Sequence, residues 1–400
     1  MEPLSTTMLG VILAAGEGTR IRPLSREVAK PMLPVAGEPL AAHVADAAVE
    51  AGVDELVFVV GYRAEGVRDH FGETYRGVPV HYAEQTDQLG TADAVLAARE
   101  HLDGPFLVLN GDNRYDPAGI AELVERGPSV GLFEVADPTN YGVVSVDDGV
   151  VTDIVEKPDD PPTNLANTGA YHFPAEAREA LEVPASERGE HELTDVLAEI
   201  AETHTVRPVT LESWMDVGRP WELLEATERE LADLERTVDG EVHPDADLRG
   251  DVVVEAGATV DAGVVIEGPV LVQSGAKIGP NAYVRGATVV GPDAKVGNGC
   301  EVKNSVLMAG ASVAHLSYVG DSVLGRDVNF GAGTQVANLR HDGADVEHTV
   351  KGERVSTGRR KFGVVAGHGA KTGVNTSLAP GLTLSVDATT TPGEYVDRDR

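Results

Sequence analysis

The stretch that decides the fold is "VHPDADLRGDVVVEAGATVDAGVVI", residues 242–266, in which an aliphatic residue returns at every sixth position. The period continues to residue 302, among residues that are otherwise polar or glycine. The positions are Val242, Leu248, Val254, Val260, Ile266, Val272, Ile278, Val284, Val290, Val296 and Val302. Small side chains precede several of them by two residues: Ala246, Ala258, Ala276, Ala282, Ala294 and Cys300. A six-residue period of this kind predicts a parallel β-helix built of hexapeptide repeats.

The same phase returns further along the chain. It is found at Leu324, Phe330 and Val336, and again at Thr372, Leu378 and Leu384. Residues 338–360, "NLRHDGADVEHTVKGERVSTGRR", break the period, and we expect them to form a projecting loop.

Upstream of the repeats the pattern differs. Apolar runs at 10–15, 55–61, 78–84 and 105–112 alternate with helical spacing at 39–52 and 91–102. Alternating strands and helices predict an α/β domain with a mostly parallel, Rossmann-like sheet whose ligands lie at the carboxyl ends of the strands. A further stretch at 220–238 is expected to be one helix closing this domain. We therefore divide the chain into a domain over 1–230, a linker over 231–241, the β-helix over 242–390 and a tail over 391–400.

The charge composition limits the classes of molecule that the protein can bind. The 400 residues include 65 acidic and 32 basic side chains, a formal net charge of −33. Such a charge argues against nucleic acid as a partner. The acidic residues are dispersed, and only eight lysines occur, which suggests a salt-adapted protein. The single cysteine, Cys300, and the lack of a basic, apolar leader or membrane segment predict a cytoplasmic protein.

The first candidate site begins at "LAAGEGTRIRPLSREVAKPMLPVAG", residues 13–37, directly after the first strand. Its glycines allow backbone N–H groups to approach phosphate oxygens, and Arg20 and Lys30 would meet a triphosphate. Asp112 lies at the end of the strand "LNGDN", where a metal-binding carboxylate is expected. The alternative is a glycine-rich turn with two surface cations and no binding role.

Over residues 9–230 the chain resembles the sugar-1-phosphate nucleotidyltransferases in motifs and in their order. "EQTDQLGTADAV", "YGVV", "VEKP", "NTGAYHF" and "WMDVGRPWELLEA" correspond to the family's base-reading, sugar-binding and second metal segments. The resemblance implies that Arg20 and Lys30 are catalytic and that Asp112 and Asp216 bind Mg²⁺. It implies that the nucleotide is bound by Ala14, Ala15, Gly16, Gly18, Gln85, Gln88, Gly90 and Thr91. It implies that the sugar phosphate is bound by Gly142, Glu156, Lys157, Asn167 and Gly169.

The run "GNGCEVKNSVLMAGASVAHLSYVGDSVLGRDVNFGAGTQVAN" resembles the acetyltransferase domain of bifunctional N-acetylglucosamine-1-phosphate uridyltransferase/glucosamine-1-phosphate acetyltransferases. The resemblance implies a left-handed β-helix that assembles as a homotrimer, with His315 as catalytic base. It further implies sugar-phosphate contacts from Arg285, Lys303, Tyr318 and Asn329. Acetyl-CoA contacts are implied for Ala332 and Lys361.

Two departures stand out. Leu339 replaces an aromatic residue of the bacterial form, and Lys351 does not align securely with the family's loop lysine. The long form "TRIRPLSREVAKPMLP" is shared with thymidylyl- and uridylyltransferases, and the combination resembles archaeal bifunctional enzymes.

These resemblances predict acetylation of glucosamine-1-phosphate by acetyl-CoA, followed by nucleotidyl transfer from UTP or dTTP with release of pyrophosphate. Three questions stay open at this stage: the nucleotide, the sugar, and whether the acetyltransferase is retained. One alternative is a monofunctional glucose-1-phosphate thymidylyl- or uridylyltransferase with a structural β-helix. A second is a non-catalytic regulatory subunit, against which the intact Arg20, Lys30, Asp112 and Asp216 argue.

Overall fold

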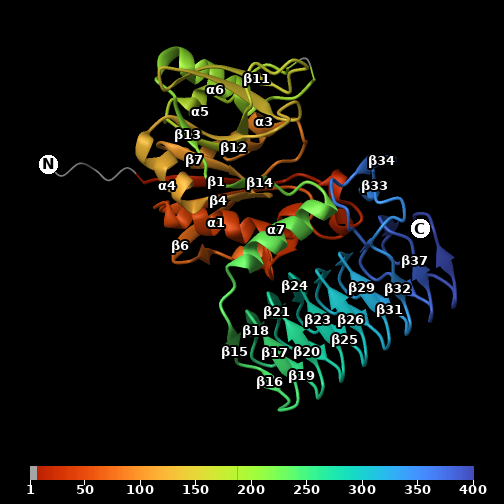
Figure 1. The fold of residues 1–400 in the computed structure, drawn as a ribbon. Coiled ribbons are helices and arrows are strands. Elements are labelled where there is room, and N and C mark those ends of the chain that lie inside the picture. Colours follow the sequence, from red (N-terminus) through yellow and green to blue (C-terminus); the bar gives the residue numbers. More distant parts are fainter. Residues whose placement is uncertain (1–6, 187) are drawn as a thin grey trace. The chain divides into compact units, whose positions relative to one another are not determined.

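The computed structural model describes residues 7–186 and 188–400 (Figure 1). By its contacts the chain forms two compact units. The first unit holds the described residues up to 17 together with 29–32 and 39–216, and the second holds 18–28, 33–38 and 217–400. In the part of the chain that the structure describes, no helix is long and apolar enough to cross a membrane.

A ten-stranded mixed sheet forms the first unit, in the order β11-β10-β12-β7-β1-β4-β6-β5, with β9 on β12 and β13 on β9. Its centre is parallel: β7 (Phe106–Asn110), β1 (Leu9–Ala14), β4 (Glu55–Val60) and β6 (Val78–Glu84). These are the four predicted apolar strands. The other strands are β5 (Thr74–Tyr75), β9 (Ser129–Glu134), β10 (Gly142–Asp147), β11 (Val150–Glu156), β12 (Leu165–Phe173) and β13 (Arg207–Thr210). β10, β11 and β12 pair antiparallel, so the predicted Rossmann-like sheet is confirmed with an antiparallel extension.

Helices pack against this sheet. They are α1 (Leu40–Glu50), α2 (Ala64–Phe71), α3 (Thr91–Ala97), α4 (Pro117–Arg126), α5 (Ala177–Ala180) and α6 (Leu193–Thr203). The helix expected over 39–52 corresponds to α1. The one expected over 91–102 is shorter, because α3 ends at Ala97 and the 3-10 turn η4 (Arg99–His101) follows. A separate ribbon joins β8 (Asn113–Tyr115) to β14 (Trp214–Asp216).

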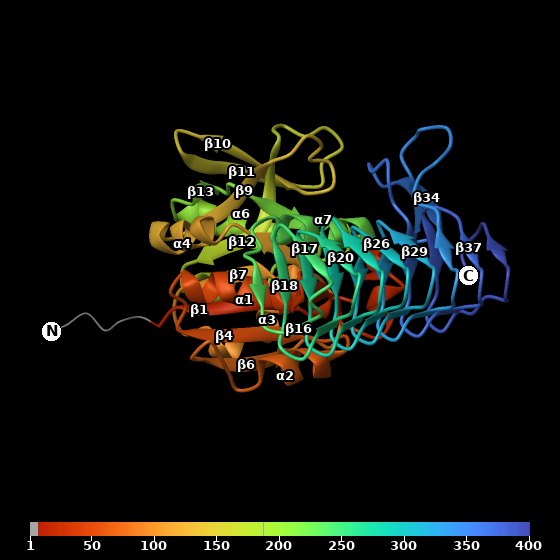
Figure 2. The same cartoon turned by 60° about the horizontal axis from the view of Figure 1, so that its bottom comes forward.

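The second unit is dominated by a three-sided parallel β-helix, as the six-residue period predicts (Figure 2). The first sheet consists of β15 (Thr237–Val238), β18 (Val252–Val254), β21 (Val270–Val272), β24 (Thr288–Val290), β27 (Val306–Leu307), β30 (Val323–Leu324), β35 (Val364–Ala366) and β38 (Leu382–Leu384). The second consists of β16 (Glu241–Val242), β19 (Thr259–Val260), β22 (Lys277–Ile278), β25 (Lys295–Val296), β28 (Ser312–Val313), β31 (Asn329–Phe330) and β36 (Lys371–Thr372). The third consists of β17 (Asp247–Arg249), β20 (Val265–Glu267), β23 (Tyr283–Arg285), β26 (Glu301–Lys303), β29 (Tyr318–Gly320), β32 (Gln335–Val336), β37 (Ser377–Leu378) and β39 (Tyr395–Val396). We call this assembly of three sheets the prism.

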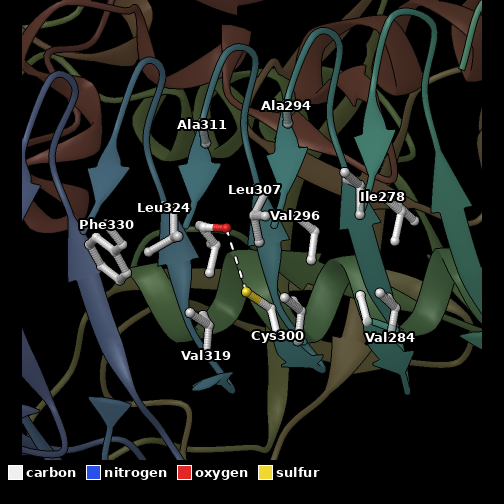
Figure 3. Packing of buried hydrophobic residues seen from close by; sticks show 14 of the residues in the cluster. Ile278, Val284, Ala294, Val296, Cys300, Leu307, Ala311, Val319, Leu324 and Phe330 are labelled. Carbon is white, nitrogen blue, oxygen red and sulfur yellow. Dashed lines mark hydrogen bonds between the residues drawn. The ribbon is translucent and has the colours of Figure 1, made fainter. Parts of the chain in front are cut away.

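The aliphatic residues of the repeat fill the interior of the prism (Figure 3). Val254, Val260, Ile266, Val284 and Val302 are all buried there. Cys300 is buried as well, and its thiol lies 2.9 Å from the carbonyl oxygen of Ala314. Each buried aliphatic side chain contributes about 1.5–3 kcal/mol of hydrophobic stabilisation.

The prism continues where the sequence period was lost, between residues 303 and 323. Leu307, Val313 and Val319 are buried inward, so the chain takes steps of five, six and six residues from Val302. A second five-residue step follows, from Val319 to Leu324. The coils there repeat after 17 residues, whereas the earlier ones repeat after 18.

Helix α7 (Pro220–Ala232) belongs to the second unit by its contacts. Leu231 packs with Leu271 of β21 and Val289 of β24. The prediction of a helix to residue 238 is wrong, because the chain turns at Asp233 and Thr237 already pairs with Val253 in the first sheet. Two short 3-10 turns, η1 (Thr19–Ile21) and η2 (Leu24–Arg26), also belong to this unit.

Residues 338–360, expected as a projecting loop, contain an antiparallel hairpin of β33 (Glu347–Val350) and β34 (Glu353–Ser356). His348 is one of the residues that anchor it, since it is fully buried and packs edge-on against Trp221 of α7 and Phe362. Its Nδ1 donates to the carbonyl oxygen of Gly381 at 3.1 Å. The hairpin is therefore part of the folded unit.

This anchor makes stability dependent on pH. Burial lowers the pKa of His348 to about 4 from the ordinary 6.5, because the imidazolium would lose its solvation. The unfolded chain takes up the proton first as the pH falls, so the contribution is intact above pH 6.5 and is lost toward pH 4. We expect a loss of about 3 kcal/mol by pH 4.

The measurement is the free energy of unfolding by denaturant at pH 7.5 and at pH 4, for wild type and His348→Gln. Subtracting the two pH dependences removes the contributions of the carboxylates and the other histidines. An identical pH dependence in both proteins would contradict this assignment.

Candidate active sites

In the first unit, Lys30 joins the two carboxylates predicted to bind metal. Its Nζ lies 2.6 Å from Asp112 Oδ2 and 3.4 Å from Asp216 Oδ1, and its side chain is only 5% exposed. Asp112 follows β7, and Asp216 ends β14, where it pairs in register with Asn113. The ribbon of β8 and β14 thus brings together two aspartates separated by more than 100 residues in sequence.

The pair suits a magnesium ion shared with phosphates. Mg²⁺ commonly takes one or two carboxylates and completes its octahedron with water and substrate oxygens. Over residues 7–186 and 188–400 no group of three or more acidic, histidine or cysteine side chains forms a closed metal cage. The described residues provide here an open pair of carboxylates next to a buried ammonium, which could share a metal ion with a substrate.

The predicted nucleotide segment closes on the end of β1. Gln88 Nε2 donates to the carbonyl oxygen of Ala15 at 3.2 Å, and Gln85 Nε2 donates to Gly90 O at 3.1 Å. Thr91 begins α3, and its hydroxyl accepts from Leu193 N. Ala14 ends the strand, and Gly16 is exposed, with open space where a Cβ would be. Gly16 thus leaves the backbone accessible for close approach, whereas Ala14 and Ala15 are buried.

Gly18 and Arg20 lie in the second unit by their contacts. Gly18 is left-handed (φ 61°) before η1, and Ser25 Oγ donates to its carbonyl oxygen at 2.7 Å. Arg20 is the last basic residue of η1 and is exposed. His368 of the same unit holds this segment through a hydrogen bond between Nε2 and Leu24 O at 2.8 Å.

The five predicted sugar-binding residues of the first unit lie together. Gly142 of β10 pairs in register with Glu156 of β11, and a Cβ at Gly142 would be 2.8 Å from Glu156 Oε2 and 3.4 Å from the Asn167 Cβ. Asn167 Nδ2 donates to Tyr171 Oη at 2.6 Å, and its Oδ1 accepts from Gly169 N at 3.0 Å. Lys157 lies next to them, with Nζ 3.3 Å from Glu156 Oε1.

Gly169 supports a stability prediction. Its φ is +73°, and a Cβ there would lie 2.0 Å from Asn110 Nδ2. Gly149 has nearly the same φ (+76°) but open space around a Cβ. We expect Gly169→Ala to cost about 3 kcal/mol and Gly149→Ala only about 1 kcal/mol, because backbone strain is common to both and the overlap is not. Equal losses of unfolding free energy would show that the overlap with Asn110 has no effect.

In the prism, Arg285, Lys303 and Tyr318 all lie on the third sheet. Arg285 and Lys303 are register partners on β23 and β26, and Lys303 is followed by Gly320 on β29. Tyr318 pairs with Glu301 in the neighbouring column. Because alternate residues of a strand face the same side, these side chains share the outer face of the sheet. Arg285 Nε and one terminal nitrogen donate to Glu301 Oε1 at 3.0 and 2.8 Å.

Two residues that the sequence did not single out connect this group. Lys303 Nζ lies 2.9 Å from Asp321 Oδ2, and Asn338 Nδ2 donates to the same oxygen at 2.6 Å. Asn338 Nδ2 also donates to Tyr318 Oη at 3.1 Å. Asn304, Asp321 and Asn338 are spaced 17 residues apart, which is the length of the local coil, so the signal was present in the sequence.

His315 is exposed in the turn between β28 and β29, three residues before Tyr318. Its Nδ1 accepts from Asn298 N at 3.2 Å, so the neutral ring carries its proton on Nε2 in this conformation. A general base must offer an unprotonated nitrogen. The base role therefore requires either the other tautomer or loss of this long hydrogen bond on substrate binding.

Three predicted residues remain: Asn329, Ala332 and Lys361. Ala332 lies in the same turn one coil later, where Gly333 N donates to His315 O, and Asn329 is exposed on β31. Lys361 is exposed and forms a β-bridge with Leu339. A pocket of about 500 Å³ opens beside Leu339. It is lined by Ala337, Leu339, Arg340, His341, Asp342, Ala379, Pro380 and Tyr395.

Known protein families match both the N-terminal and the C-terminal part of the chain. Residues 9–233 match the nucleotidyl transferase family, and residues 266–363 match the GMPPB C-terminal domain family. The bifunctional protein GlmU of Methanocaldococcus jannaschii is 39% identical over 98% of this chain and 95% of its own. The bifunctional sugar-1-phosphate nucleotidylyltransferase/acetyltransferase of Sulfurisphaera tokodaii is 36% identical over 98% of both chains. A structure of UDP-glucose pyrophosphorylase with UDP-glucose has a TM-score of 0.52 and 25% identity, and covers 57% of this chain and 99% of that one.

Proposed function

Because the chain belongs to the family of bifunctional GlmU-type sugar-1-phosphate nucleotidylyltransferase/acetyltransferases, we propose that it acetylates glucosamine-1-phosphate and then couples the product to a nucleotide. The polar cluster of the prism carries the proposal, since a purely structural β-helix needs no buried ion pair on its outer face. We assign acetyl transfer to residues 242–390 and nucleotidyl transfer to residues 1–230.

In acetyl transfer, the amine of glucosamine-1-phosphate attacks the acetyl-CoA thioester. An N–C bond forms, the C–S bond breaks, and CoA leaves as a thiolate, which becomes the thiol on taking up the proton that the amine has lost. His315 takes the amine proton, and Arg285 and Lys303 bind the sugar phosphate. Tyr318 and Asn329 orient the sugar. Ala332 and Lys361 bind acetyl-CoA, and the β-bridge of Lys361 to Leu339, which lines the pocket of about 500 Å³, supports the role of Lys361.

In nucleotidyl transfer, a phosphate oxygen of the sugar-1-phosphate attacks the α-phosphorus of UTP, and pyrophosphate leaves. Mg²⁺ held by Asp112 and Asp216 would neutralise phosphate charge. Lys30 and Arg20 bind the departing phosphates, and the segment around Gln85 and Gln88 holds the base. Catalysis is then positioning and charge neutralisation without a covalent protein intermediate.

We also propose that the chain is a cytoplasmic homotrimer that works at high salt. The dispersed charge of −33 supports the salt requirement, because such a surface repels itself at low ionic strength. Sedimentation in molar KCl would distinguish the trimer from a monomer.

The test of function separates the two reactions. Thiol release from acetyl-CoA is measured with glucosamine-1-phosphate, and pyrophosphate release with N-acetylglucosamine-1-phosphate and either UTP or dTTP. Pyrophosphate without thiol from well-folded protein would support the monofunctional alternative instead. Absence of both would support a regulatory subunit. A higher rate with dTTP would reassign the nucleotide.

A further inference from the structure

Asp321 is a buried carboxylate at the centre of the prism's polar cluster. It is 3% exposed and accepts from three side chains: Lys303 Nζ and Asn338 Nδ2 at Oδ2, and Asn304 Nδ2 at Oδ1 (3.0 Å). Burying a carboxylate is costly unless a cation and hydrogen bonds compensate it, and this one has both. The cluster also reaches α7, because Asn304 Nδ2 donates to Glu228 Oε1 at 2.7 Å.

The shortened coils put this carboxylate in place. The two five-residue steps occur at Asn304 and Asp321, which both adopt left-handed backbone conformations, φ +47° and +51°. Asn and Asp tolerate this region better than other non-glycine residues. Asp321 N donates to Lys303 O at 2.9 Å, which stacks one corner directly on the other. The position of the carboxylate is therefore set by the backbone.

The carboxylate also fixes which way neighbouring groups point. An ionised carboxylate can only accept, so Asn338 must turn its amide nitrogen toward Asp321. The two Nδ2 hydrogens then go to Asp321 and Tyr318, and the amide presents Oδ1 as an acceptor. Tyr318 accepts from Asn338 and keeps its own hydrogen to donate.

We propose that Asp321 is a positioning residue of the acetyl-transfer site, which holds the Lys303 ammonium and sets the direction of the Asn338 amide. The site then offers donors from Lys303 and Tyr318 to phosphate and hydroxyl groups, and an acceptor from Asn338 to an amino group. This inference deepens the proposed function and rests on it.

The first test is kinetic. We expect Asp321→Asn to raise the KM for glucosamine-1-phosphate at least tenfold and to lower kcat, with pyrophosphate release from N-acetylglucosamine-1-phosphate unchanged. Asp327→Asn is the matched control, since Asp327 is also a left-handed corner residue (φ +56°) but is exposed. Thiol release within twofold of wild type for Asp321→Asn would overturn the positioning role.

A second readout does not need turnover. Lys303 has a side chain only 16% exposed and paired with Asp321, whereas Lys277 is exposed. Labelling by an amine reagent, followed by peptide mass spectrometry, should accelerate severalfold at Lys303 relative to Lys277 in Asp321→Asn. Unchanged relative labelling overturns the inference even if activity falls. If Lys303 is labelled faster in Asp321→Asn but wild type releases no thiol, Asp321 does hold Lys303, and the proposed acetyl transfer is overturned.

A double variant distinguishes a positioning effect of Asp321 from a loss of stability. If Asp321 acts through Asn338, then Asp321→Asn should lower kcat/KM much less in an Asn338→Ala background than in wild type. Fully additive losses would overturn the action of Asp321 through Asn338, and the melting temperature of each variant shows how much fold is lost.

Discussion

Replacing His315 by alanine is expected to slow thiol release from acetyl-CoA by about 10²–10⁴-fold, the usual contribution of a general base. His315 is exposed in a turn, and its side chain makes one long hydrogen bond with a backbone amide. The substitution should therefore leave the prism folded and pyrophosphate release from N-acetylglucosamine-1-phosphate unchanged.

His243→Ala is the matched control for this variant. His243 is also exposed on the prism, and its Nδ1 likewise accepts from a backbone N–H, that of Asp245 at 3.1 Å. It lies in the first coil, about 70 residues before His315. Thiol release in His315→Ala equal to that in His243→Ala would remove His315 from the mechanism.

Asp112→Asn is expected to impair nucleotidyl transfer and to leave acetyl transfer intact, the reverse of His315→Ala. Removing this carboxylate takes away half of the proposed magnesium site and the shorter of the two carboxylate contacts of Lys30, that of 2.6 Å, while the 3.4 Å contact to Asp216 remains. We expect pyrophosphate release to fall by about 10²–10³-fold, comparable to removal of one electrostatic contact to the transition state. Thiol release should remain as in wild type.

Its matched control is Asp116→Asn, because Asp116 caps α4 with an Oδ1 contact to Ala118 N, and asparagine caps a helix equally well. Both variants lose one negative charge from the same region of sequence. Full pyrophosphate release by Asp112→Asn would contradict the metal assignment, as would an equal loss in Asp116→Asn.

Periodicity predicted the fold because it reports burial directly. The aliphatic residues from Val242 onward point into the prism, or pack against its core at the first coils, since this position of each six-residue repeat faces inward. Helix α7 was predicted too long because helix formers such as Glu235 and Arg236 continue past Asp233, whereas strand pairing at Thr237 decides the outcome. Local propensity is overruled there by the prism.

Sequence motifs indicated some residues of the two candidate sites and not others. Motif order gave Lys30, Asp112 and Asp216, and the structure brings their side chains together. Asp321 and Asn338 were missed, because each looks like an ordinary corner residue until the 17-residue coil length is known. The hydrogen bond between His368 and Leu24 spans 344 residues, and no local pattern predicts such a contact.

The measurement that tests the central claim most directly follows both products in one reaction. Wild-type protein in high salt receives glucosamine-1-phosphate, acetyl-CoA and UTP, and thiol and pyrophosphate are recorded together. Two sites acting in sequence predict that thiol appears first and that omitting acetyl-CoA abolishes or strongly slows pyrophosphate release. Pyrophosphate release at full rate without acetyl-CoA, together with no thiol release when it is present, would contradict two sites in one chain.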